Sequence, residues 1–238
     1  MKSSIEYIAN FKTSLDPYNG ITILSEDLPK DILEFEQNLK DLIQNVKDNK
    51  NLIWIYIDIK KSDFIPIATK FGFTFHSCNS DYILLVKVLK QNAIVPNLAN
   101  HTLGVGAVVI NSRNEILLIK EIIRNEYYKL PGGHIDDAEM ISQALSREVF
   151  EETGVVVDFE RIKSIGHFYP HQFHKSNLYI LCTATPKSYA IDIQDSHEII
   201  DAKWVDVNEY INDEDVLDYA KAIVIAAIKS KGFSRANQ

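Results

Sequence analysis

Three glutamates near the end of one predicted helix are the best candidates for chemistry in this 238-residue sequence. Glu148, Glu151 and Glu152 are spaced so that a helix places their carboxylates on one face. This spacing is unfavourable by itself, because like charges repel and acidic groups at a helix C-terminus oppose the helix dipole. Mg²⁺ would remove both penalties, since carboxylates, backbone carbonyls and substrate phosphates are its usual ligands. We therefore predict a metal site, with Arg147 orienting a neighbouring glutamate through paired hydrogen bonds.

The residues around the cluster predict the helix that carries it. Asp136 and Glu139 form a capping-box pattern, so we expect the helix to begin at Asp136. Gly154 should end it, because glycine readily takes the left-handed conformation. A buried face is predicted from the aliphatic residues at helical spacing, which are Ile141, Ala144, Leu145 and Val149.

Residues 133–155, GHIDDAEMISQALSREVFEETGV, match every fixed position of the Nudix box, G-x5-E-x7-R-E-U-x-E-E-x-G-U with U aliphatic. The sequence thus resembles the Nudix hydrolases, which hydrolyse a nucleoside diphosphate linked to another moiety. The resemblance implies an α/β fold with a mixed sheet sandwiched between helices. It also implies Mg²⁺ or Mn²⁺ bound by Glu148, Glu151, Glu152 and the Gly132 carbonyl, with Arg147 and Glu139 supporting the loop. The alternative for such a cluster is an exposed acidic helix, against which the intact spacing argues.

Segments outside the box are similar to a Nudix subgroup that contains plant ADP-ribose/NADH pyrophosphatases. This subgroup carries an N-terminal domain with an acetyltransferase-like (GNAT-related) fold. Three departures from the subgroup concern the substrate preference. Tyr127-Tyr128 precede Lys129 where tryptophan is usual, the arginine usual after the box is absent, and Asn177 replaces an aspartate. The similar segments are Ile53–Ile55, Ile65–His76, Gly104–Ala107, Lys129–Gly133, Glu198-Ile199 and Ala202–Trp204.

A domain boundary is expected between Leu89 and His101, a stretch with Pro96 and several asparagines. Residues 1–97 are expected to form a small GNAT-like α/β domain, and residues 98–238 the Nudix domain. In the first we predict strands at 21–24, 51–57, 73–76 and 82–88 and helices at 32–46 and 65–71. In the second we predict a hairpin across residues 111–114, strands near 155–157, 178–184 and 202–205, and one final helix from Val216 to Ile228.

A hydrolase of this class needs a general base near the attacking water. By resemblance the base is either a glutamate from a loop after the box, for which Glu198 is the candidate, or a box glutamate. The predicted catalytic residues are therefore Glu151, Glu152 and Glu198, together with Arg147, which orients a neighbouring glutamate. The alternative for Glu198 is a solvated loop carboxylate.

Lys129, Tyr128 and His171 are the predicted substrate-binding residues. His167, His171 and His174 lack metal-site spacing and are interrupted by Pro170, which favours a loop over the substrate cleft. Three aromatic residues are either stacked on a base or simply packed, namely Tyr127, Tyr128 and Phe168.

The net charge of −8 is unevenly distributed, at −1 for residues 1–97 and −7 for the remainder. There is no basic patch of the kind that nucleic-acid binding requires. No apolar run reaches the roughly 20 residues needed to cross a bilayer. The N-terminal residues lack the apolar run of a secretory signal, and Cys78 and Cys182 suggest neither a disulfide framework nor a zinc site. A cytoplasmic location is the expectation.

The expected function is Mg²⁺-dependent hydrolysis of the pyrophosphate bond in ADP-ribose or NADH, with triphosphates disfavoured. Three basic residues lie nearest the expected cleft in sequence, namely Lys129, Arg124 and Lys175. The alternative is a non-catalytic nucleotide-binding regulator, which is less consistent with an intact box and one helix after Trp204. Residues 1–97 lack an acetyl-CoA pyrophosphate loop and are expected to have a structural, substrate-gating or dimer-forming role. A homodimer is therefore one of the possible assemblies.

Overall fold

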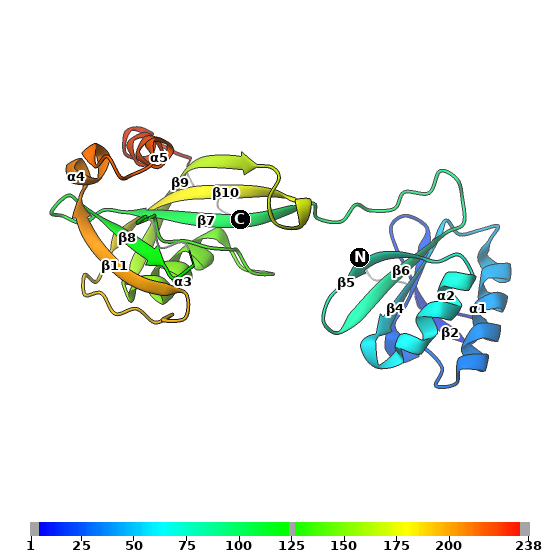
Figure 1. The fold of residues 1–238 in the computed structure, drawn as a ribbon. Helices are drawn as coiled ribbons and strands as arrows, with labels where there is room; N and C mark the ends of the chain where they lie inside the picture. Colours follow the sequence, from blue (N-terminus) through cyan, green and yellow to red (C-terminus); the bar gives the residue numbers. More distant parts are fainter. Residues whose placement is uncertain (1–4, 124–126, 234–238) are drawn as a thin grey trace. The chain divides into compact units, whose positions relative to one another are not determined.

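The computed structural model describes residues 5–123 and 127–233. The chain divides into two compact units, Met1–Leu98 and Ala99–Gln238 (Figure 1). The predicted boundary after residue 97 lies beside this division, and both units have the predicted α/β character. In the part of the chain that the structure describes, no helix is both long and apolar enough to span a membrane.

The N-terminal unit is built on one six-stranded sheet with the order β1-β2-β3-β4-β6-β5. Among the strand pairs that the structure describes in this sheet, β3–β4 is parallel and the others are antiparallel. The strands are β1 (Ile5–Ile8), β2 (Phe11–Leu15), β3 (Gly20–Ile23), β4 (Leu52–Asp58), β5 (Thr74–Cys78) and β6 (Tyr82–Val88). The helices are η1 (Ser25–Asp27), α1 (Ile32–Val46), η2 (Ile59–Phe64) and α2 (Ile65–Lys70).

Strand β4 lies at the centre of this unit because it is apolar on both faces. Helix α1 packs on one face, and its Phe35 stacks on Phe64 with ring centroids 4.6 Å apart. Trp54 packs on the other face with residues 93 and 95. The predicted strands and helices of this unit are confirmed, whereas β1 and β2 are additional. These two strands have four and five residues, too short for a clear alternating pattern.

The C-terminal unit contains two sheets, β7-β10-β9 and β11-β8. Strands β7 and β10 are parallel, and the other pairs are antiparallel. The strands are β7 (His101–Val109), β8 (Glu115–Glu121), β9 (Val157–Phe168), β10 (Ser176–Pro186) and β11 (Ile199–Asp206). The helices are α3 (Ile141–Thr153), η3 (Gln172–His174), α4 (Val207–Asn212) and α5 (Asp218–Lys229).

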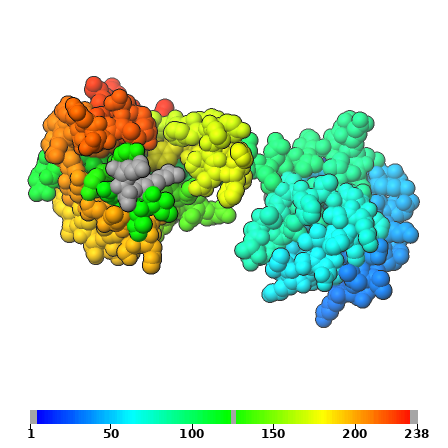
Figure 2. Space-filling model, in the orientation of Figure 1, coloured from blue at the N-terminus to red at the C-terminus, as the bar shows by residue number. Residues whose placement is uncertain are grey.

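The sheets of this unit are covered by helices on both sides, as predicted. Val105, Ala107 and Val109 of β7 pack with α3, whereas Val108 packs with α4 and α5. Successive residues of β7 therefore pack into two different hydrophobic cores, because successive side chains of a strand point to opposite faces of the sheet. In the ribbon view α3 lies on one side of the strands and α4 and α5 on the other (Figure 1). The space-filling view shows α4 and α5 in orange and red on the surface of this unit (Figure 2).

Three predictions about the strands and the last helices of this unit need correction. The turn at residues 111–114 is present, with the Asn111 N–H donating to the Glu115 carbonyl at 2.9 Å. Its two strands join different sheets, however, and meet in an isolated bridge between Ile110 and Ile116. Strand β9 extends to Phe168, far beyond residue 157. Two helices follow Trp204 instead of one, because α4 has six residues and gives no periodic signal.

Gly104 and Gly106 lie within β7, and their spacing is explained by Tyr179 of β10. A Cβ atom on Gly106 would lie 2.0 Å from the Tyr179 Oη, and one on Gly104 would lie 3.0 Å from its Cδ2. The Tyr179 ring therefore occupies the space that side chains on β7 would fill. This agrees with the prediction that Gly104-x-Gly106 belongs to a strand and is not a phosphate loop.

We expect Gly106→Ala to lower the free energy of unfolding by about 1–3 kcal/mol, because the methyl group overlaps the Tyr179 ring. Urea denaturation of Gly106→Ala, Tyr179→Ala and the double variant measures the coupling. The double variant should lose less stability than the sum of the single losses. Strictly additive losses would contradict the contact.

Candidate active site

Helix α3 begins at Ile141, five residues after the predicted start at Asp136. Ala138 has φ of 63°, which interrupts a right-handed helix before it can form. The Glu139 carboxylate still accepts a hydrogen bond from the Asp136 N–H at 3.1 Å, but it closes a separate turn. The helix itself is capped by Gln143, whose side chain accepts from the Met140 N–H at 3.0 Å. Its predicted end is confirmed, with Gly154 at φ of 70°.

Arg147 joins the loop before α3 to the glutamates of the helix. Its Nε and Nη2 donate to the two Glu139 carboxylate oxygens at 2.9 Å each. Its Nη1 donates to Glu148 and to Glu151, both at 3.0 Å, and Nη2 also donates to the His134 carbonyl at 3.0 Å. The bidentate pair lowers the pKa of Glu139 and raises that of Arg147. The structure thus gives Arg147 and Glu139 the loop-supporting contacts that the resemblance implies.

Glu152 points into the protein and is only 4% exposed. Its carboxylate accepts a hydrogen bond from the Gly132 N–H at 2.7 Å. Burial raises the pKa of Glu152 to about 8, although the Gly132 bond and Lys129 act in the opposite direction. Burial also raises the pKa of Glu148, against the lowering effect of Arg147. A nearby positive charge would therefore stabilise the ionised form of both carboxyl groups.

The Gly132-Gly133 segment pairs with β7 through the residues on either side of Gly132. The Ala107 N–H donates to the Pro131 carbonyl and the Val105 N–H to the Gly133 carbonyl, both at 2.9 Å. Gly132 itself has φ of 144°, and a Cβ there would lie 2.1 Å from the Val105 carbonyl oxygen. Among the described residues, no group donates a hydrogen bond to the Gly132 carbonyl. This oxygen is therefore available as a ligand.

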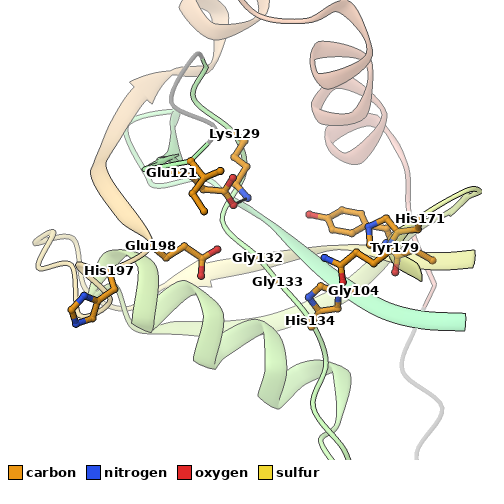
Figure 3. A pocket seen from close by; sticks show the side chains of 13 residues that line it. Gly104, Glu121, Lys129, Gly132, Gly133, His134, His171, Tyr179, His197 and Glu198 are labelled. Atoms are coloured by element: carbon orange, nitrogen blue, oxygen red, sulfur yellow. Dashed lines mark hydrogen bonds and ion pairs between the residues drawn. The ribbon is translucent and has the colours of Figure 1, made fainter. Parts of the chain in front are cut away.

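The loop before β11 brings Glu198 to the box glutamates. The backbone N–H groups of Gln194 and Asp195 donate to the Glu151 carbonyl at 3.0 and 2.8 Å, so the loop is attached to the end of α3. After the dominant effect of burial, repulsion by Glu198 contributes to the raised pKa values of Glu148 and Glu152. The Glu198 side chain points toward the Gly132-Gly133 segment, whereas His197 points away (Figure 3).

A cavity of about 600 Å³ is lined by Glu198 and the Gly132-Gly133 segment, whereas Arg147, Glu148, Glu151 and Glu152 are not among its described lining residues. Of the residues predicted for the site, Gly132, Lys129, His171 and Glu198 line it. The sequence did not single out Glu121, His134 or Tyr179, which also line it. Glu121 forms an ion pair with Lys129 from the next extended segment, and their positions in Figure 3 show this pairing. The available signal for Tyr179 was the pair of glycines opposite it in β7.

Tyr128 is held by neighbours outside this cavity. Its hydroxyl donates to Asp201 at 2.5 Å, and the Lys203 Nζ lies 3.8 Å from its ring centroid. Its predicted role in binding substrate therefore stays a prediction. Phe168 lies at the end of β9 and is 46% exposed, and Arg124 lies outside the described residues.

The donor set suits a hard divalent cation, because it consists of carboxylates and a free backbone carbonyl. No three of the described His, Cys, Asp and Glu side chains are already arranged to hold a metal ion. Glu148 and Glu151 are instead bound to Arg147. Metal binding would therefore require these two glutamates to exchange a guanidinium contact for the cation. The predicted ligands Gly132, Glu148, Glu151 and Glu152 stay a prediction.

Comparison with known proteins places the chain in a family. Residues 100–225 match the NUDIX domain, and residues 11–89 match a second profile described as a Nudix hydrolase domain. Nudix hydrolase 7 of Arabidopsis thaliana is 30% identical over 220 residues, which are 89% of this chain and 77% of that protein. The chain belongs to the Nudix hydrolase family, an enzyme class that acts on pyrophosphate bonds.

Two other relatives are similar over most of the chain. Nudix hydrolase 8 of Arabidopsis thaliana is 31% identical over 82% of this chain, which spans 55% of that protein's length. Nucleoside diphosphate-linked moiety X motif 6 of Homo sapiens is 33% identical, covering 84% of this chain and 66% of that protein. The GNAT-like character of the N-terminal unit stays a prediction.

We expect Glu152→Gln to raise the stability of the metal-free protein in alkaline solution. The folded-state pKa of about 8 exceeds the ordinary value of 4.5, so the folded protein holds an extra proton between these values. Its stability must therefore fall as the pH rises through this window. Glutamine removes that loss, which is on the order of a few kcal/mol.

Thermal unfolding in EDTA between pH 5 and 9 measures this difference. Glu214→Gln, which replaces an exposed glutamate, is the matched control and should follow the wild type. Parallel pH profiles for Glu152→Gln and the wild type would show that Glu152 is not buried as described.

Proposed function

We propose that this chain hydrolyses the pyrophosphate bond of nucleoside diphosphate-linked compounds with Mg²⁺ or Mn²⁺, and that its substrates are ADP-ribose, NADH or both. The observation that carries this proposal is that Glu198 lines one cavity with Gly132 and Gly133, the two residues that Glu152 and Glu148 lie against. Glu121 and Glu198 line this cavity, and Glu148 and Glu152 lie behind its glycine residues. Such a group of carboxylates repels an anionic substrate unless a cation binds both the carboxylates and the substrate. The family membership supports the same chemistry.

Under this proposal, Glu148, Glu151, Glu152 and the Gly132 carbonyl would hold the cation. When bound, it would neutralise charge on the phosphate oxygens and acidify the attacking water. Glu198 would accept the proton of that water as it attacks one phosphorus. The bond from this phosphorus to the bridging oxygen breaks, which leaves two phosphate monoesters.

Lys129 and His171 are the residues proposed to contact the diphosphate. Lys129 is paired with Glu121 in the described structure and would transfer its ammonium contact to a phosphate oxygen. His171 faces the same cavity from the other side, where its ring lies 6.3 Å from that of His134. Under this proposal Lys129 and His171 position the diphosphate, whereas the glutamates hold the cation and accept the proton.

The charge of the C-terminal part favours a diphosphate diester over a triphosphate. Residues 98–238 carry a net charge of −7. Among the described residues that line the cavity, Lys129 is the one Lys or Arg side chain. A triphosphate brings more negative charge than this site can neutralise without further cations. ADP-ribose and NADH carry only the two charges of their diphosphate.

We expect the purified protein to cleave ADP-ribose and NADH to mononucleotides when Mg²⁺ or Mn²⁺ is present, with higher kcat/KM than for ATP. Glu151→Gln and Glu152→Gln should each lower kcat by more than about 100-fold, because a missing ligand weakens charge stabilisation in the transition state. Product analysis by chromatography measures this, with Glu214→Gln as control. Near-normal activity in both variants would refute the metal site. Nucleotide binding without turnover would favour the alternative, a regulatory nucleotide-binding protein.

Glu198→Gln tests the proposed base separately. We expect kcat to fall by about 10²–10⁴, the usual contribution of general base catalysis, while KM changes little. The metal concentration that gives half-maximal activity should also stay unchanged, because Glu198 is not proposed as a ligand. A large shift in that metal concentration, with kcat recovered at high metal, would make Glu198 a ligand instead of the base.

A further inference from the structure

A second cavity, of about 430 Å³, adjoins the first in the C-terminal unit. The two share Glu121, Ile123 and Lys129. Lys129 therefore lies between the first cavity, which Glu198 also lines, and the second. A ligand whose diphosphate lies beside Lys129 can place one of its two ends in this second cavity.

The second cavity differs from the first in its apolar and aromatic lining. Tyr127 and Tyr128 line one wall, and the start of α5 contributes Leu217 and Tyr219. In the space-filling view, the green surface that follows β8 lies beside the orange surface that leads into α5 (Figure 2). These two segments are far apart in the sequence, and the fold alone joins them.

Large apolar side chains are exposed around this cavity. The exposed fractions are 94% for Ile123, 62% for Tyr219, 47% for Leu217 and 45% for Tyr127. A group of exposed apolar side chains around one hollow is costly in water and is typical of a ligand site. The Tyr128 ring behind them is fixed, since Asp201 binds its hydroxyl and Lys203 covers its ring.

We propose that this cavity binds the aromatic ring of the nucleotide substrate, a purine or nicotinamide ring, while the attached diphosphate lies beside Lys129. A flat ring gains contact with tyrosine and leucine side chains whatever its hydrogen-bonding pattern. A sugar offers hydroxyl groups, for which Glu121 and Lys129 are the only charged partners among the described lining residues. This proposal rests on the proposed function, because that function places the diphosphate beside Lys129.

Binding of mononucleotides to the metal-free full-length protein tests this site without any hydrolysis. AMP and nicotinamide mononucleotide are compared with ribose 5-phosphate, which has the phosphate and sugar but no ring, by calorimetry in EDTA. We expect the ring to lower Kd by about 10-fold or more, the usual effect of stacking on aromatic side chains. Tyr219→Ala and Leu217→Ala should each remove most of this advantage, and Tyr219→Phe should keep it.

Two matched controls exclude general effects of losing an exposed apolar side chain. Ile228→Ala, at 47% exposure in the same helix as Tyr219, and Tyr7→Ala, at 78% exposure in the other unit, should bind AMP as the wild type does. Equal Kd values for AMP and ribose 5-phosphate in the wild type would overturn the proposal. So would a ring-dependent advantage that survives both Tyr219→Ala and Leu217→Ala. Ring-dependent binding without hydrolysis of ADP-ribose would leave this site standing and refute the proposed function alone.

Discussion

The hydrogen bond from the Gly132 N–H to the buried Glu152 carboxylate is the contact on which the rest of the site depends. It joins α3 to a segment that is itself paired with β7, so helix, loop and sheet are fixed relative to one another. A carboxylate that is 4% exposed would be costly without such a partner. The close approach of this segment to α3 and β7 also requires the two glycines, because a Cβ on Gly133 would lie 2.6 Å from the Glu148 carboxylate and one on Gly132 2.1 Å from the Val105 carbonyl oxygen.

Arg147 explains how several acidic groups coexist at one end of a helix. Its guanidinium binds Glu139, Glu148 and Glu151 together with a loop carbonyl. In the described structure it supplies part of the positive charge that a cation would supply to the proposed metal site. A guanidinium and a divalent cation compete for the same oxygens, so cation binding and the Arg147 contacts are expected to be coupled. The Glu139 pair is separate from the proposed ligands and can keep the loop in place during this exchange.

The C-terminal unit places an acidic cavity beside an apolar one, with Lys129 and Glu121 between them. Glu198, the proposed base, lines the acidic cavity, whereas the described lining of the second cavity is apolar and aromatic apart from the shared Glu121 and Lys129. This separation matches a substrate in which a charged diphosphate is attached to a neutral ring. The parallel pairing of β7 with β10 contributes to the same arrangement, because it sets Tyr179, which lines the acidic cavity, against Gly104 and Gly106 of β7.

The sequence by itself determined the features that depend on neighbouring residues. The aliphatic stripe of α3, its end at Gly154 and the grouping of its glutamates follow from helical spacing, and the structure confirms the stripe and the end. The start of the helix was wrongly predicted, because the Asp136–Glu139 capping pattern closes an isolated turn when Ala138 takes a positive φ. Local propensity cannot show that Glu139 gains more from Arg147 than from beginning a helix.

The tertiary structure alone decided which distant residues meet. Glu198 joins the glutamates because the preceding loop is bound to the last turn of α3, a contact across more than forty residues. Glu121, His134 and Tyr179 belong to the cavity for the same kind of reason, and Tyr128 lies outside it because Asp201 and Lys203 hold it. A one-dimensional pattern records spacing along a helix or strand, whereas these contacts depend on the pairing of strands from different parts of the chain.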